Sequence, residues 1–398
     1  MKIAVVLDSA VPSGGGFNQS LSALRQLSEI CAGVHDLLVV TTKKENLPTI
    51  SRLGIAVLHL VDGVADRLAA KLFQTSWGGA LSFRLRCLPP FEKALIEAGV
   101  DLCYFLSPSY IPLSFQRLNY VVTVWDLCHQ SHPEFPEVRA FGEFGARERL
   151  YSALLPSAFA IIADSDVLKK QILAKYAVSP ERVVPMPFSP SPFAVEEIAG
   201  ECTDGSVCKY DRYFFYPAQY WAHKNHIRIL EALAILAAKR VMANVVFCGG
   251  DKGQREYLQR QASRLGVDAQ AEFLGFVSNC ELVRLYRNCT AVVMPSYFGP
   301  TNLPPLEAWS YGKPLVYSAH LHEQAGNAAV LIDPDSAGSL ADALLHVSDP
   351  EFANDLVVKG RKRLGELALQ RTEGELQLQQ LLHRFDMRCR TWRQDAKE

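Results

Sequence analysis

The sequence has no excess of charge of either sign: 41 Lys and Arg stand against 42 Asp and Glu, for a formal net charge of -1. Nucleic-acid-binding proteins usually show a clustered basic excess, so this balance disfavours a nucleic-acid partner. No apolar run approaches the ~20 residues that a membrane-spanning helix needs. The N-terminal sequence MKIAVVLDSA turns acidic after a short apolar run, unlike a secretory signal. We therefore expect a cytoplasmic protein.

Cysteine pairs of the kind that hold zinc or serve redox chemistry are also missing, because none of the ten cysteines has C-x-x-C spacing. The cysteines are scattered, and most stand among apolar residues, as small buried side chains do. Hydrophobic residues make up 49% and charged residues 21%, which is typical of a globular protein. A chain of 398 residues exceeds one ordinary hydrophobic core, so we expect two domains.

Short apolar runs alternate with amphipathic stretches along most of the chain. Runs such as residues 102–106 are apolar at successive positions, as strands covered on both faces are, and helical periods such as residues 139–155 lie between them. This alternation predicts an α/β fold with doubly wound parallel sheets.

Prolines crowd the stretch from residue 185 to about residue 210, where the alternation weakens, and a second alternation follows. We therefore expect an N-terminal Rossmann-like domain over residues 1–190, a linker over 191–210 and a second Rossmann-like domain over 211–372. An amphipathic helix over residues 373–398 is expected to pack back on the first domain.

The segment from Met294 to Val316 reads MPSYFGPTNLPPLEAWSYGKPLV and predicts a strand, a loop and a helix beginning at Pro304. The amides of such a loop and helix start bind phosphate. Glu307 in the first turn suits the helix dipole and can accept hydrogen bonds from a ribose. Its alternative role is only to stabilise the helix end.

A second segment, FFYPAQYWAHKNHIRILEAL, predicts a strand, a loop with Lys224 and an amphipathic helix. A cation at a water-poor diphosphate site contributes strongly, because charge-assisted hydrogen bonds are roughly twice as strong as neutral ones. Seen alone, Lys224 also fits a solvated loop lysine. Gly249 and Gly250 end a further strand, where glycine permits close backbone approach to a ligand or simply makes a turn.

In the first half of the chain, Ser13-Gly14-Gly15-Gly16 follows the first strand. The run is not a G-x-G-x-x-G fingerprint, which disfavours a dinucleotide site. Asp126 and His129 follow another strand, in the segment VVTVWDLCHQSHPEFPEV. Polar groups at such strand ends meet substrates, although structural loop histidines are also common.

The order and spacing of these segments resemble the donor site of the retaining glycosyltransferase family four, whose fold is called GT-B. The chain keeps the family's Leu-Pro-x-Leu-Glu-Ala at residues 303–308 and its Gly-x-Pro strand start at residues 312–314. The resemblance covers almost all of the second domain. It implies two Rossmann-like domains facing a central cleft, and a metal-independent, retaining hexosyltransferase with a nucleotide-sugar co-substrate and no cofactor.

The resemblance also implies roles for single residues. Lys224 would neutralise the donor diphosphate, Glu307 would bind the ribose hydroxyls, and Leu303 would pack near the base. The family's first acid, its arginine and its histidine fall at Gly299, Gln219 and Trp125, so sugar recognition must differ. The remaining residues expected at the donor are Gly15, Gln219, Gly249, Gly299, Thr301 and Asn302. The residues expected to act in catalysis are Lys224, His129 and Asp126.

Related motif forms occur in builders of bacterial surface polysaccharides such as O-antigen. This implies mannose transfer from GDP-mannose to a glycan or lipid-linked acceptor. A UDP-sugar transferase, a nucleotide-sugar epimerase, a pyridoxal-phosphate phosphorylase and a catalytically silent sugar-nucleotide binding module remain alternatives. Peripheral contact with the inner leaflet of the membrane is a further expectation. The arginines named for it are Arg84, Arg86, Arg147 and Arg149, which equally fit ordinary helix surface.

Overall fold

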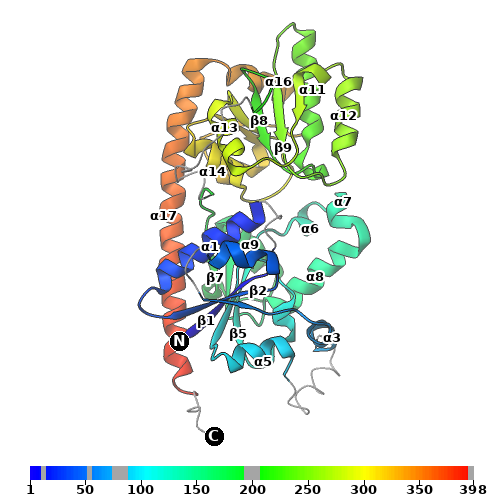
Figure 1. Cartoon of the computed structure of the whole chain (residues 1–398). Helices are drawn as coiled ribbons and strands as arrows, with labels where there is room; N and C mark the ends of the chain where they lie inside the picture. The colour runs from blue at the N-terminus through cyan, green and yellow to red at the C-terminus, as the bar shows by residue number, and fades with distance from the viewer. Residues whose placement is uncertain (10–14, 52–55, 74–87, 192–206, 393–398) are drawn as a thin grey trace. The chain divides into compact units, whose positions relative to one another are not determined.

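The structure is a computed structural model, and it describes residues 1–9, 15–51, 56–73, 88–191 and 207–392 (Figure 1). The chain forms two compact units. Unit 1 comprises Met1–Leu127, Gly145–Pro187 and Gln370–Glu398, and unit 2 comprises Cys128–Phe144 and Phe188–Leu369. Residues 128–144 thus belong to unit 2, although their neighbours on both sides in sequence belong to unit 1.

Unit 1 contains a seven-stranded parallel sheet in the order β3-β2-β1-β4-β5-β6-β7. Ile3 and Val5 of the first strand pack in one hydrophobic core, and Ala4 and Val6 pack in another. This alternation shows that both faces of the sheet are covered. The strands are β1 Lys2–Leu7, β2 Asp36–Thr41, β3 Val57–His59, β4 Leu102–Phe105, β5 Asn119–Val124, β6 Ala160–Ala163 and β7 Val183–Pro185.

Helices lie on both sides of this sheet. Leu24 and Leu27 of α1 pack with Ile3 and Val5, whereas Leu95 of α5 and Leu154 of α8 pack with Ala4 and Val6. The helices are α1 Gly15–Cys31, α2 Leu47–Ser51, α3 Val64–Phe73, α5 Pro90–Glu97, α8 Glu143–Leu154 and α9 Asp166–Lys175, with 3-10 turns at Lys44–Asn46, Ile111–Ser114 and Pro180–Arg182.

Unit 2 contains a six-stranded parallel sheet in the order β10-β9-β8-β11-β12-β13. Its strands are β8 Phe214–Pro217, β9 Val245–Cys248, β10 Ala271–Phe273, β11 Ala291–Met294, β12 Leu315–Ser318 and β13 Val330–Ile332. Its helices are α6 Cys128–Ser131, α7 Pro136–Arg139, α11 His226–Ala238, α12 Arg255–Arg264, α13 Asn279–Asn288, α14 Leu303–Ser310, α15 His322–Ala325 and α16 Ala337–His346, with 3-10 turns η4 Ala140–Gly142, η6 Ala222–Lys224, η7 Asp268–Gln270 and η8 Ala319–Leu321.

The C-terminal helix is longer than the sequence predicts: α17 runs from Pro350 to Cys389, not from residue 373. Gly360 lies in the missed part, and glycine lowers helix propensity. The structure gives the reason for this glycine, because a Cβ there would overlap the indole of Trp309. In the part of α17 that belongs to unit 1, Leu378 and Phe385 pack in the core with Ile3.

Two further expectations concern the connections and the membrane. The linker expected over residues 191–210 lies mostly outside the described residues, which resume at residue 207. Among the helices that the structure describes, none has the length and apolar character needed to cross a bilayer.

Candidate functional site

The topology of unit 2 points to one edge of its sheet. Strand β8 lies between β9 and β11. From β8 to β10 the strands are added on one side, and from β11 to β13 they are added on the other side. Loops that leave two such neighbouring strands diverge, and the crevice between them is where doubly wound sheets bind ligands. The loop after β8 carries Gln219 and Lys224, and the loop after β11 carries Gly299 and Asn302. These four sequence-predicted donor residues therefore lie on the two loops that flank this one crevice.

A direct hydrogen bond joins the two loops. The half-buried Lys224 donates from Nζ to Oδ1 of Asn302 at 3.2 Å. Asn302 is buried and precedes α14 as its N-cap residue. Its Nδ2 donates to the carbonyl of Gly299 and to the hydroxyl of Tyr317, both at 2.8 Å. The ammonium group is thus held beside the N-terminus of α14.

The backbone that carries Lys224 is fixed on several sides. Asn225 adopts the left-handed conformation with φ 57°, which asparagine tolerates better than most residues. Its Nδ2 donates to the carbonyls of Pro295 at 3.1 Å and Pro334 at 2.8 Å. The carbonyl of Lys224 accepts from the hydroxyl of Tyr216 at 2.8 Å. These contacts place the start of the lysine side chain with little freedom.

The start of α14 offers fewer backbone N–H groups for an anion than a typical helix start does. Pro304 and Pro305 occupy its first turn and have no N–H. The backbone N–H of Asn302 donates to Oε1 of Gln324 at 2.9 Å. Among residues 302–305, this leaves the backbone N–H of Leu303 for an anion. The positive charge of Lys224 therefore carries more of the attraction for an anion here than the helix start does.

Position 299, where the resemblance places an acid, holds a glycine with little room for a side chain. Gly299 has φ 110°, and a Cβ there would stand 2.9 Å from Oδ1 of Asn302. A side chain at position 299 would displace the side-chain amide of Asn302, whose Oδ1 accepts from Lys224.

Glu307 is buried in the first turn of α14, where it is 5% exposed. Its Oε2 accepts from the hydroxyl of Tyr286 at 2.5 Å, and its Oε1 accepts from the hydroxyl of Ser191. Burial raises the pKa of Glu307, and the two hydroxyl donors counteract only part of that effect. A carboxylate has about four lone-pair positions, so it retains acceptor capacity for further hydroxyls. Sequence reasoning missed both hydroxyl partners.

The loop after β9 approaches the loop after β8 closely. A Cβ on Gly249 would lie 2.7 Å from the backbone nitrogen of Gln219. The side-chain Oε1 of Gln219 accepts from Nε1 of Trp221 at 3.0 Å, and the ammonium of Lys252 lies 5.4 Å from the Trp221 ring centroid. Lys252 is a second cation near these loops, and no motif in the sequence indicated it.

The segment over residues 128–144 contributes a carboxylate to the Lys224 loop. Oε1 of Glu137 accepts from the backbone N–H of His223 at 2.9 Å and contacts Nδ1 of its ring. Burial favours the neutral form of Glu137, but the hydrogen bonds from His223 outweigh it and lower the pKa of the carboxyl. The His223 ring stacks on Phe298, with centroids 3.8 Å apart and planes 16° apart.

The remaining predicted residues lie elsewhere. Asp126 follows β5 in unit 1 and pairs with Nη1 of Arg147 at 3.0 Å. Gly15 begins α1, while residues 10–14 of the glycine-rich run lie outside the described residues. His129 belongs to unit 2 and is fully buried, with its ring against Phe144. The structure therefore does not bring the His129 ring to a surface open to substrate.

Unit 1 has its own crevice position between β1 and β4. Asp8 follows β1 there and accepts from Thr42 at 2.7 Å and from Ser109 at 2.9 Å. Sequence reasoning did not single out this carboxylate, because only the sheet order brings Asp8 together with its two partners. Of the arginines expected at a membrane, Arg84 and Arg86 lie outside the described residues, and Arg147 pairs as described above.

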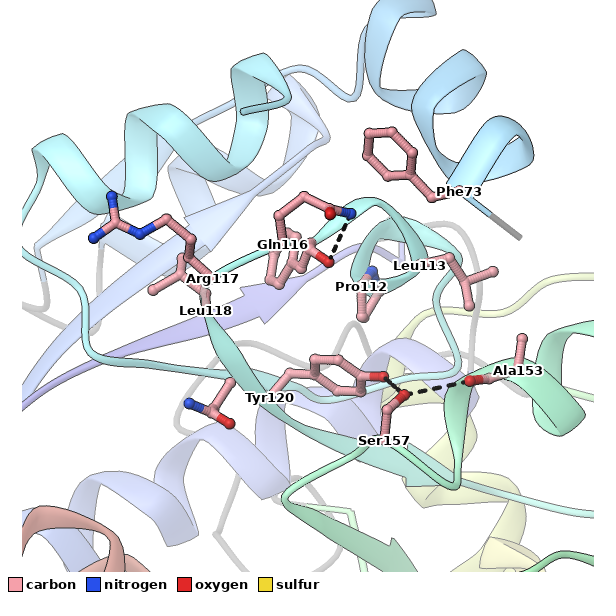
Figure 2. A pocket seen from close by; sticks show the side chains of 11 residues that line it. Phe73, Pro112, Leu113, Gln116, Arg117, Leu118, Tyr120, Ala153 and Ser157 are labelled. Carbon is pink, nitrogen blue, oxygen red and sulfur yellow. Dashed lines mark hydrogen bonds between the residues drawn. The ribbon is translucent and has the colours of Figure 1, made fainter. Parts of the chain in front are cut away.

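A cavity of about 330 Å³ in unit 1 lies away from these loops (Figure 2). Asn119 and Tyr120 in its wall are the first residues of β5, so it opens at the amino ends of the strands. The hydroxyls of Tyr120 and Ser157 bond to each other at 2.7 Å (Figure 2). Ligands of doubly wound sheets bind at the carboxyl ends, so this cavity is not the candidate site.

Known proteins resemble the chain in sequence. Residues 208–363 match the family described as Glycosyl transferases group 1. The O-antigen chain mannosyltransferase B of Escherichia coli is 27% identical over 272 residues, which is 65% of this chain and 69% of that protein. Two other curated relatives are matched over 34% and 33% of their own length.

Solved structures share the fold over nearly the whole chain. A glycosyltransferase from Rickettsia africae superimposes with a TM-score of 0.68 at 13% identity, covering 96% of this chain and 98% of that one. The Anabaena protein Alr3699/HepE, solved in complex with UDP-glucose, gives a TM-score of 0.66 at 16% identity, covering 95% of this chain and 99% of that one. At these identities the likeness is one of fold.

Proposed function

We propose that the chain is a member of the glycosyl transferases group 1 family, whose model matches residues 208–363, and that it is a retaining hexosyltransferase. Its GT-B fold, which the sequence predicts, supports this proposal. The reaction moves a sugar from a nucleotide-sugar donor to a glycan or lipid-linked acceptor in the synthesis of a surface polysaccharide. We infer mannose from GDP-mannose as the donor, because the relative from Escherichia coli that matches 65% of this chain is a mannosyltransferase. A UDP-sugar donor is the second candidate, since Alr3699/HepE was solved with UDP-glucose.

The hydrogen bond between Lys224 and Asn302 is the observation that carries this proposal. It fixes a cation at the crevice between the loops after β8 and β11. Asn302, which holds this cation, lies five residues before the buried carboxylate of Glu307. The diphosphate and the ribose of a sugar nucleotide are adjacent groups, one anionic and one rich in hydroxyls. A cation and an acceptor carboxylate on neighbouring elements match that pair of groups.

In the proposed reaction the bond between the sugar carbon and the diphosphate oxygen breaks, and the acceptor hydroxyl oxygen bonds to that carbon on the same face. Negative charge develops on the departing diphosphate, which takes up the acceptor proton. Lys224 stabilises this charge, and the rigid turn around it means that little reorganisation is needed during the reaction. The proposal includes no metal and no cofactor, so activity should persist in excess chelator.

Turnover by a Lys224→Ala variant tests the proposal. GDP release from GDP-mannose and the glycosylated acceptor are measured together, and we expect both in the wild type and neither in the variant. Lys239→Ala is a matched control, because Lys239 is the C-cap residue at the other end of α11 and pairs with Asp342 on the surface. An active Lys224→Ala variant with a normal melting temperature would contradict the assignment of Lys224 to the diphosphate.

The same assay separates the alternatives. Donor conversion without a glycosylated product favours an epimerase, and donor binding without turnover on any acceptor favours a binding module. A pyridoxal phosphate absorbance band in the purified protein favours a phosphorylase. Retention is checked by NMR, which should find the donor's anomeric configuration preserved in the product. Co-sedimentation with anionic vesicles tests the proposed peripheral contact with the cytosolic leaflet.

A further inference from the structure

The carboxylate of Glu137 reaches the donor loop from a distant part of the sequence. It lies 86 positions before His223, in the segment over residues 128–144 that belongs to unit 2. One oxygen, Oε1, contacts both the backbone N–H and the ring Nδ1 of His223. The sequence segment that carries Asp126 and His129 also contains Glu137, but no motif in it singles out this carboxylate.

The contact bears directly on the turn that carries Lys224. His223 and Lys224 are consecutive residues of η6, and the carbonyl of His223 accepts from the backbone N–H of Tyr297 at 2.9 Å. The His223 ring is clamped between Glu137 and Phe298, and Phe298 directly precedes Gly299. The backbone N–H, the backbone carbonyl and the ring of His223 are all engaged by Glu137 or by the loop after β11.

We propose that Glu137 is a positioning residue of the donor site, which acts through His223 to hold the ammonium of Lys224 at the crevice. The inference rests on the proposed function, because it presumes that Lys224 meets the donor diphosphate. A lysine on a loose loop must be ordered when the nucleotide binds, and that ordering weakens binding. Glu137 removes part of this loss in advance by helping to fix the turn before the ligand arrives.

The test measures GDP and UDP affinities by calorimetry, well below the melting temperature of each variant. Glu137→Ala should weaken nucleotide binding at least about tenfold. Glu137→Gln keeps an acceptor oxygen at the same reach and should stay within about threefold of the wild type. Glu134→Ala is the matched control, because Glu134 is an exposed carboxylate of the same segment and should leave the affinity unchanged.

A Lys224→Ala background separates positioning from a general structural role. If Glu137 acts through Lys224, then adding Glu137→Ala to Lys224→Ala should weaken binding no further. A structural defect would instead lower the affinity by the same factor in both backgrounds. If Glu137→Ala fails to fold, Glu137→Asp replaces it, because the shorter side chain keeps the charge but withdraws it from His223.

The outcomes distinguish this inference from the proposed function. Wild-type affinity in folded Glu137→Ala, combined with weakened affinity in Lys224→Ala, would overturn the role of Glu137 and leave the function standing. Equal losses in the two backgrounds would also overturn it. If the wild type bound neither GDP nor UDP, that result would contradict the proposed function and therefore this inference as well.

Discussion

Replacing Glu307 tests how the donor site is built, apart from any ligand. The side chain is buried, and its two oxygens accept from the hydroxyls of Tyr286 and Ser191. Glu307→Ala leaves both hydroxyls without their acceptor, at about 1–3 kcal/mol each. With the added cavity, we expect a loss of about 3–5 kcal/mol in the free energy of unfolding of unit 2. Glu307→Gln keeps the volume and one acceptor oxygen, so it should lose less than about 1.5 kcal/mol.

The pH dependence gives a second, independent check. Because burial raises the folded-state pKa of Glu307, its contribution to stability is fully present below the unfolded pKa of about 4.3 and is lost as the pH rises through the folded value. The wild type should therefore lose stability relative to Glu307→Gln as the pH rises above about 4.3. Urea unfolding, followed by tryptophan fluorescence and circular dichroism at several pH values, measures this difference.

Two results would refute this reasoning. An unfolding midpoint of Glu307→Ala equal to that of the wild type would mean that the hydroxyl pair does not depend on the carboxylate. A stability difference between the wild type and Glu307→Gln that does not change with pH would mean that the folded-state pKa is not raised. In either case Glu307 would be an ordinary helix-end acid, the alternative that the sequence left open.

Two further predictions concern neighbouring positions. Gly249→Ala places a Cβ against the backbone of Gln219, so the loops after β8 and β9 must separate; we expect a loss of about 1–3 kcal/mol in stability, seen by thermal denaturation, together with weaker nucleotide binding. His226 is fully buried between Tyr216 and Tyr220, and burial lowers its pKa to about 3. The unfolded chain takes up this proton near pH 6.5, so wild-type stability should fall as the pH drops from about 6.5 towards 3, and His226→Phe should flatten that slope in urea titrations.

Much of the fold could be predicted because buried parallel strands read as continuous apolar runs. The run around Leu102 and the run around Val121 are β4 and β5, paired in register in the sheet of unit 1. The donor residues of unit 2 could be named because they follow strand ends within short, recognisable segments. The roles expected for them in catalysis and donor binding stay predictions.

The rest depends on contacts between residues that are distant in sequence. The residues around Glu137 do not indicate that it contacts His223, because the two residues are 86 positions apart and no common sequence pattern links them. The start of α17 was missed because Gly360 looks like a helix breaker until Trp309 is seen packed against it. The expectation of phosphate-binding amides at α14 overlooked that Pro304 and Pro305 have no N–H to donate.

The central claim is that a nucleoside diphosphate binds at the crevice beside Lys224. Thermal stabilisation by a panel of GDP, UDP, ADP and their sugars tests it most directly, since a ligand at a hundred times its Kd stabilises by about 2.7 kcal/mol. We predict a clear shift with GDP or UDP in the wild type and in Lys239→Ala, and a much smaller shift in Lys224→Ala. No shift with any nucleotide in the wild type, or an undiminished shift in Lys224→Ala, would contradict the account.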